Sequence, residues 1–297
     1  MRALVMPKVP TAVTTKDEIM LEGIIDYAGL YPPASLDMQS VVHNWSEFLQ
    51  SDDNWMLARL IIPSNQIDEF TQCAKGLLPP AGEEMWQLSM LLPPASDDGF
   101  EDAVQKTIAF NISDCGAVAN VVEFKAGTAS EIDTALELLH DDLFPFIELP
   151  IDEDPRGLIA CLSGAIAGAK VRTGGIVADM YPTSNALALF IHSCAVAGQS
   201  FKATAGLHHP CQNQNDNVGV KEFGFLSVLQ ATAAANIHGA SVEDVEQILT
   251  LAKPDLSMFT DTELEQVRAE LFNSIGSCSL DDPRNDLRKM GLLKESK

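Results

Sequence analysis

The chain alternates between two patterns of hydrophobic and polar positions. Short, nearly continuous apolar runs end in proline or glycine, and such runs are typical of parallel strands that are buried on both faces. Between them lie stretches with apolar residues at three- and four-residue spacing, which predicts amphipathic helices. We therefore expect strands in eight runs, at residues 23–33, 56–63, 86–94, 120–127, 144–150, 168–175, 200–210 and 272–280.

The order of these runs predicts the fold class. The intervals between the first seven runs can each hold one helix, with examples at 64–78, 130–143 and 182–198. Eight strands alternating with helices predict one α/β domain over residues 1–297, a (β/α)8 TIM barrel, with a doubly wound open sheet as the alternative. The interval between strands seven and eight is longer. There we expect a helical insertion at about 211–270, with helices at 221–239, 241–252 and 260–272.

Composition narrows the class of protein. The 297 residues include 42 acidic and 19 basic ones, which gives a formal net charge of −23. Nucleic acids and anionic membranes are bound by clustered lysine and arginine, so neither is an expected partner. The six cysteines are scattered, with no C-x-x-C pair, which indicates free thiols in a reducing compartment. The apolar run before Pro7 is too short for a signal segment, so we expect a cytoplasmic protein.

Two neighbouring strand runs carry cations near their carboxyl ends. Lys170 and Arg172 are two residues apart in "GAKVRTGG", so their side chains point to one face of the strand. The next run, "FKATAG", places Lys202 and Thr204 on one face in the same way. Both faces of a barrel strand are covered, so a cation there is costly unless it is paired or lies at the strand end. Active sites of barrels lie at these carboxyl ends, which makes both lysines candidate catalytic residues.

The closeness of the two lysines predicts an unusually low pKa for one of them. Adjacent strands are about 4.8 Å apart, and two ammonium groups about 5 Å apart repel by roughly 3 kcal/mol at an effective dielectric near 20. That repulsion corresponds to a depression of about two pKa units, which leaves one amine partly neutral and nucleophilic toward carbonyls. The alternative is that each lysine pairs with a carboxylate, such as Glu123 or Glu148, and only ties strands together.

The lysine segments resemble those of a known family. K-x-x-T-G at Lys170–Gly174, followed by F-K-x-x-x-G at Phe201–Gly206, resembles the paired-lysine signature of the deoxyribose-phosphate aldolases. The resemblance implies a class I aldolase on a (β/α)8 barrel, in which Lys170 forms a Schiff base and Lys202 lowers the pKa of Lys170. The family's sixth strand carries the Schiff-base lysine before a Thr-Gly turn, which is Thr173-Gly174 in this chain.

Other segments resemble the same family in chain order. "IDYAGL" at 25–30 is similar to its first strand, whose aspartate supports the site, and this role carries over to Asp26. "LIIP" and "FIELP" are similar to the second and fifth strands, with Glu148 at the place of a strand-five glutamate. "GSCSL" resembles the end of the eighth strand, which binds the substrate phosphate through serines and backbone N–H groups. Cys278 and Ser279 occupy those places.

The chain departs from the family pattern at several positions. The proton-relay aspartate before "FIELP" has no direct counterpart, since "NVVEFKAG" offers Asn120 or Glu123. The phosphate-binding double glycine after the seventh strand is replaced by Ala205-Gly206. The resemblance therefore favours inheritance of the fold over an identical substrate. Foreign to the family are the long insertion, the "YPP" segment after the first strand, and the pair His208 and His209.

The expected function is that of an aldolase-like lyase acting on a small carbonyl compound with an anionic group. A protonated imine is itself the electron sink, so the reaction needs neither a metal nor a cofactor. The amphipathic helices of the insertion are suited to cover the mouth or to join subunits, so a homo-oligomer is one expectation. The expected catalytic residues are Lys170, Lys202, Asp26, Glu123, Glu148, His208 and His209, and the expected substrate-binding residues are Arg172, Thr173, Gly174, Thr204, Gly206, Gly276, Ser277, Cys278 and Ser279.

Two alternatives from other classes stay open. The barrel could be a metal-dependent hydrolase or lyase built on His208, His209 and an acid at a strand end, although adjacent residues in a turn seldom chelate one ion well. It could also be a non-catalytic barrel that binds an anionic metabolite. Such a protein keeps the same cations and glycines but has no turnover.

Overall fold

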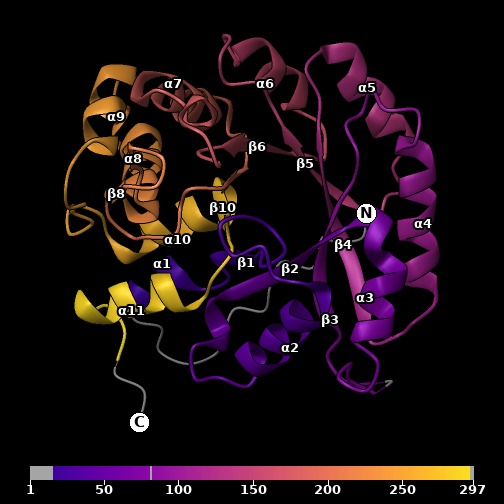
Figure 1. Cartoon of the computed structure of the whole chain (residues 1–297). Helices are drawn as coiled ribbons and strands as arrows, with labels where there is room; N and C mark the ends of the chain where they lie inside the picture. The colour runs from indigo at the N-terminus through magenta and orange to yellow at the C-terminus, as the bar shows by residue number, and fades with distance from the viewer. Residues whose placement is uncertain (1–15, 81, 295–297) are drawn as a thin grey trace.

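A computed structural model describes residues 16–80 and 82–294 of the chain. Within this part, eight parallel strands close into a barrel surrounded by helices, which confirms the (β/α)8 TIM barrel over the open sheet (Figure 1). The amino-terminal segment, from which we expect no signal peptide, lies outside the described residues. In spatial order the strands are β1 (Ile25–Tyr27), β10 (Phe272–Ser277), β7 (Phe201–Thr204), β6 (Gly168–Arg172), β5 (Phe144–Glu148), β4 (Ala117–Lys125), β3 (Trp86–Leu91) and β2 (Leu57–Pro63).

Helices alternate with the first seven strands as the apolar spacing predicts. Several begin at a side-chain cap, because Asp37, Thr128 and Thr183 each accept a hydrogen bond from a backbone N–H in the first turn. These helices are α2 (Met38–Leu49), α3 (Ile67–Cys73), α4 (Phe100–Ile112), α5 (Ala129–Leu138), α6 (Arg156–Leu162) and α7 (Ser184–Ala197). Their apolar faces cover the barrel and explain why the strands are apolar on both sides.

The segment between β7 and β10 contains the predicted helices and a hairpin that was not predicted. The hairpin strands are too short and too polar to show the alternation of a buried strand, and Gly219 makes its turn with a φ of 76°. Helix α8 is buried nearly all round and packs against α7 and α9, as Figure 1 shows. The elements are β8 (Asn213–Asn215), β9 (Val220–Glu222), α8 (Phe225–His238), α9 (Val242–Leu249) and α10 (Asp261–Glu270).

Two further helices lie near the ends of the described chain. Helix α1 (Lys16–Leu21) packs against α10, and α11 (Asp281–Lys289) follows β10 directly. Within the described ranges, every helix is too short or too polar to cross a lipid bilayer.

Candidate active site

The two lysines lie side by side inside the barrel. Lys170 on β6 and Lys202 on β7 are register partners, and Lys170 is also the register partner of Glu148 on β5. Lys170 is 4% exposed and Lys202 is fully buried. Their pairing in register confirms that the two lysine segments form neighbouring strands with both cations facing the interior. A buried ammonium is stable only with a partner, so its contacts determine its chemistry.

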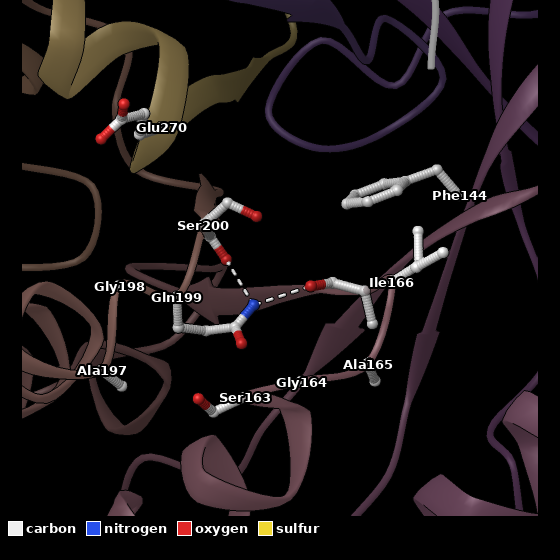
Figure 2. A pocket seen from close by; sticks show the side chains of 11 residues that line it. Phe144, Ser163, Gly164, Ala165, Ile166, Ala197, Gly198, Gln199, Ser200 and Glu270 are labelled. Carbon is white, nitrogen blue, oxygen red and sulfur yellow. Dashed lines mark hydrogen bonds between the residues drawn. The ribbon is translucent and has the colours of Figure 1, made fainter. Parts of the chain in front are cut away.

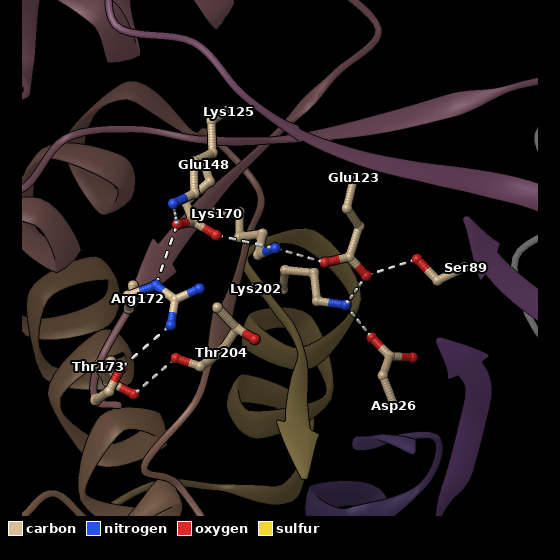
Figure 3. A network of polar contacts seen from close by, with 11 residues as sticks. Asp26, Ser89, Glu123, Lys125, Glu148, Lys170, Arg172, Thr173, Lys202 and Thr204 are labelled. Atoms are coloured by element: carbon tan, nitrogen blue, oxygen red, sulfur yellow. Dashed lines mark hydrogen bonds and ion pairs between the residues drawn. The ribbon is translucent and has the colours of Figure 1, made fainter. Parts of the chain in front are cut away.

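The carboxylate of Glu123 lies between the two ammonium groups (Figure 3). Its Oε2 is 2.9 Å from Nζ of Lys170, and its Oε1 is 2.6 Å from Nζ of Lys202. Ser89 on β3 donates a further hydrogen bond of 2.6 Å to Oε1. Asn120, the other candidate on β4, instead donates to Gln87 on β3. The structure therefore places Glu123, and not Asn120, among the lysines.

Each lysine has a second carboxylate on its outer side. Oε2 of Glu148 is 3.0 Å from Nζ of Lys170, while Oε1 of Glu148 faces Arg172 at 3.3 Å and Lys125 at 3.4 Å. Lys202 forms an ion pair with Asp26 on β1.

Asp26 is held in turn by the neighbouring strands. Ser274 donates a hydrogen bond of 2.6 Å to Oδ2, and Nη1 of Arg59 lies 3.7 Å from Oδ1. The result is one chain of alternating charges that runs across the interior from Arg172 to Arg59, as Figure 3 shows in part.

These contacts overturn the expected pKa of Lys170. Burial by itself lowers that pKa, but the charges of Glu123 and Glu148 outweigh burial and raise it above its ordinary value. Burial by itself raises the pKa of Glu148, but the charges of Lys170 and Arg172 have the larger effect and lower that pKa to about 2. The pKa of Glu123 is also held below its ordinary range by the two lysines, against the effect of burial. The prediction that repulsion discharges a lysine was wrong, because the intervening carboxylates cancel it.

The turns after β6 and β7 are joined by hydrogen bonds. The backbone N–H of Thr173 donates to the carbonyl of Thr204 over 2.8 Å, and its hydroxyl donates to the carbonyls of Thr204 and Ala205. A Cβ at Gly174 would lie 3.0 Å from Cα of Gly206, so the two turns approach as closely as glycine allows. Thr173, Gly174, Thr204 and Gly206 are therefore together at the mouth.

The end of β10 completes this rim. A Cβ at Gly276 would lie 2.8 Å from Oγ1 of Thr204, which is its register partner. Ser277 donates to the carbonyl of Ser279 over 2.7 Å. Cys278 is buried, and burial raises the pKa of its thiol. The rim thus brings together the residues expected to hold an anion.

The two loop histidines point to different places. Nδ1 of His208 is 3.3 Å from Oγ of Ser277 and 3.8 Å from Sγ of Cys278, at the rim. Burial lowers the pKa of His208, which favours the neutral form of its ring. His209 instead pairs with Asp286 on α11, over 2.6 Å. Because the imidazoles diverge, the geometry does not favour a shared metal ion, and no three His, Cys, Asp or Glu side chains in the described ranges are placed to hold one.

Several site residues have only weak signals in the sequence. Ser89 is one of two polar residues, with Gln87, in a strand run that is otherwise apolar, which is a signal for polar contacts within the sheet. Tyr181 and Glu222 have none, because they meet across 41 residues of sequence: Tyr181 donates to Glu222 over 2.7 Å. Burial and then the Glu222 carboxylate raise the pKa of Tyr181 to about 12. Since Tyr181 also packs against Gly174, the insertion hairpin borders the mouth.

A pocket at the other end of the barrel is a different feature. It is lined by Phe144 at the start of β5 and by the segments that precede β6 and β7, and Glu270 is its one ionisable side chain among the described lining residues (Figure 2). Gln199 spans it, donating to the carbonyls of Ala167 over 2.7 Å and Ser200 over 3.2 Å. Residues at the amino-terminal end of a barrel generally serve stability, so we assign no catalytic role to this pocket.

Comparison with known proteins does not identify a family: no family model matches the chain, and no curated protein matches it. The resemblance to the deoxyribose-phosphate aldolases stays a prediction that depends on the lysine segments. The barrel itself is a fold common among enzymes, with active sites at the carboxyl ends of the strands. The fold by itself does not determine the function, which depends on the residues at that end.

Proposed function

We propose that the protein is a class I aldolase-like lyase that acts on a small carbonyl compound with an anionic group, with Lys170 forming the imine. One observation carries the proposal. Lys170 and Lys202 are register partners inside a closed barrel, each two residues before the carboxyl end of its strand, and one carboxylate, Glu123, contacts both. Charged clusters buried at this end of a barrel are typical of catalytic sites. The resemblance to the deoxyribose-phosphate aldolases supports the same assignment.

The ion pairs determine how the reaction has to begin. Lys170 rests as an ammonium, so it must first give a proton to a neighbour, and Glu123 is 2.9 Å away. The lone pair of Nζ then forms the C–N bond while the carbonyl electrons move to oxygen. Transfer of a proton from nitrogen to that oxygen gives a carbinolamine. Glu123 returns its proton to the hydroxyl, which leaves as water, and Lys170 becomes a protonated imine.

Bond cleavage uses the imine as an electron sink. The electrons of the bond between the α and β carbons move into the imine and give an enamine. The hydroxyl on the β carbon loses its proton to a carboxylate and becomes the carbonyl of the released aldehyde. Lys202 stays paired with Asp26 and keeps a positive charge beside the reacting nitrogen, which favours the neutral form of Lys170 once Glu123 is protonated.

The rim residues supply the anion site of this proposal. Arg172 is partly exposed, and its planar guanidinium can bind two oxygens of a phosphate or a carboxylate. The glycine turn after β6 and the end of β10 lie at the same rim, and backbone N–H groups of such turns can bind an anion. Phosphate and carboxylate are both accommodated by this chemistry.

A non-catalytic, anion-binding barrel is the second candidate. The specific observation in its favour is that carboxylates neutralise both lysines, which is what a purely structural network requires. In that case the cations at the rim still bind an anion, but Lys170 never loses its proton.

Reductive trapping separates the two candidates. The protein is incubated with acetaldehyde, pyruvate or glyceraldehyde 3-phosphate, reduced with borohydride, and mapped by peptide mass spectrometry. If the protein is a lyase, we expect a mass increment on Lys170 with at least one compound. We also expect no mass increment at position 170 in Lys170→Arg, because this variant keeps the charge between Glu123 and Glu148 but cannot form the imine. Lys106→Arg, on the exposed face of α4, is the matched control and should be labelled like the wild type.

The outcomes are distinct. An increment that maps to another lysine contradicts the role of Lys170. Binding of glyceraldehyde 3-phosphate or inorganic phosphate by calorimetry, without any increment, favours the non-catalytic barrel instead.

A further inference from the structure

Tyr31 carries a buried hydroxyl that no described residue satisfies. Its ring is partly exposed, but the hydroxyl oxygen is buried and has no hydrogen-bond partner within the described ranges. Buried hydroxyl groups are almost always paired, because an unpaired one loses its bonds to water without replacement. An exception at a candidate active site needs an explanation other than stability.

The loop that carries Tyr31 is well defined. It follows β1 directly, and the N–H of Ala28 donates to the carbonyl of Ser277 over 2.7 Å, which ties the loop to the end of β10. The N–H of Tyr31 donates to the carbonyl of Ala28, and its own carbonyl accepts from Ser35, both over 3.0 Å. Hydrogen bonds on both sides of Tyr31 fix its backbone, so the unpaired hydroxyl does not result from an unsupported turn.

Tyr31 lies in the loop that leaves β1 at the carboxyl end of the barrel, next to the end of β10, and the charges of the lysine site act on its hydroxyl. Burial raises the pKa of Tyr31, the negative charge of Glu123 raises it further, and the positive charge of Lys170 opposes this effect. The two ionised groups that act on Tyr31 are thus the ones proposed to exchange a proton. Because the pKa of Tyr31 is raised above the ordinary value of tyrosine, the phenol keeps its hydrogen at pH 7 and can donate a hydrogen bond.

We propose that the hydroxyl of Tyr31 donates a hydrogen bond to the carbonyl oxygen of the substrate while Lys170 attacks the carbon. The inference rests on the proposed function and adds a substrate-contacting residue to it. As the C–N bond forms, the carbonyl electron pair moves to oxygen, where a preorganised donor is most effective. Tyr31 keeps its proton in this step; the oxygen is protonated from nitrogen and then from Glu123, and leaves as water. If the hydroxyl serves as donor to that oxygen, it has no hydrogen-bond partner before the substrate binds.

The test compares two tyrosine-to-phenylalanine substitutions. Tyr31→Phe removes the unpaired hydroxyl, whereas Tyr27→Phe removes a hydroxyl that accepts a hydrogen bond of 3.2 Å from Asn44 on α2, outside the barrel interior. The rate of reductive trapping on Lys170 is measured with acetaldehyde, pyruvate and glyceraldehyde 3-phosphate, together with the midpoint of thermal unfolding.

The two variants should change in opposite ways. Tyr31→Phe should trap about 100-fold more slowly, the size of effect seen when one oxyanion donor is lost. Its thermal midpoint should equal or exceed that of the wild type, because an unsatisfied buried hydroxyl has been removed. Tyr27→Phe should trap at the wild-type rate but unfold at a lower temperature, since Asn44 loses its acceptor.

Each contrary result has one meaning. If the wild type traps carbonyls on Lys170 and Tyr31→Phe does so at the same rate, the role of Tyr31 is refuted and the proposed function stands. A loss of rate accompanied by a lower thermal midpoint also refutes it, because the hydroxyl then supports the fold. If the wild type traps none of the three compounds, the proposed function and the role of Tyr31 are both refuted.

Discussion

Replacing Glu123 with glutamine keeps the shape of the side chain but removes the charge between the two lysines. Its oxygens lie 2.9 Å from Nζ of Lys170 and 2.6 Å from Nζ of Lys202. At an effective dielectric of about 20, each contact corresponds to a Coulomb attraction of about 6 kcal/mol before desolvation is subtracted. A glutamine has one acceptor oxygen, so its amide N–H groups must face one of the ammonium groups.

The net loss of stability is smaller than the Coulomb sum but still large. Lys170 keeps Glu148 and Lys202 keeps Asp26, so neither cation is left alone. Removing one partner from a buried ion pair costs about 3–5 kcal/mol, and we expect Glu123→Gln to lower the free energy of unfolding by that amount. For a chain of this length, the midpoint of thermal unfolding should fall by about 10 °C.

Urea unfolding at pH 7, followed by tryptophan fluorescence, measures this loss. The control is Glu137→Gln on the exposed face of α5, which should change the free energy of unfolding by less than about 0.5 kcal/mol. A loss below about 1 kcal/mol for Glu123→Gln, with the control unchanged, would refute the reasoning that this carboxylate stabilises the fold through its ion pairs with both lysines.

Three further predictions concern the rim and its supports. The pKa of Glu148 is lowered from 4.5 to about 2, so its ion pairs contribute about 3 kcal/mol above pH 4.5, a contribution lost as the pH falls toward 2. The stability difference between wild type and Glu148→Gln, from urea titrations at several pH values, should shrink over that window; a constant difference contradicts it. Gly206→Ala should destabilise by about 1–2 kcal/mol, because φ is 75° and the carbonyl of Thr173 lies 3.0 Å from the new Cβ; unchanged urea unfolding contradicts this. Tyr181→Phe leaves the buried Glu222 one donor short, so amide hydrogen exchange in β8 and β9 should accelerate while the barrel strands stay protected, and equal exchange contradicts the link.

The position of the lysine site could be predicted before its contacts were known. The two-residue spacing in β6 and β7 predicts that Lys170 and Lys202 share the interior face, and the glycine turns that follow predict that the carboxyl end of each strand is only two residues away. Both conclusions depend on local geometry that a short segment carries by itself. Pairing of the lysines with Glu123 or Glu148 was the alternative to repulsion, and the structure confirms the ion pairs. Local geometry could not decide between pairing and repulsion, because Glu123 is 47 and 79 residues from the two lysines along the chain.

The insertion between β7 and β10 also has one part that the sequence predicted and one part that it did not. Its helices were predicted because apolar spacing is a property of each helix alone, and α8, α9 and α10 lie within the predicted ranges. The hairpin of β8 and β9 was missed because short polar strands are stabilised by what they meet in space. Here the contact of Glu222 with Tyr181 ties the hairpin to the mouth.

The sequence by itself determined the alternation of strands and helices and the strand face on which the lysines lie, since period-two strands and 3.6-residue helices encode direction locally. Closure into a barrel was decided against an open sheet only in the structure. Only the tertiary structure decided the protonation states of the charged side chains at the site. A pKa depends on every ionised group within a few ångströms in all directions, and closure of the barrel brought Asp26, Glu123 and Glu148 from distant strands to Lys170 and Lys202. Their order in space turned an expected repulsion into a chain of ion pairs.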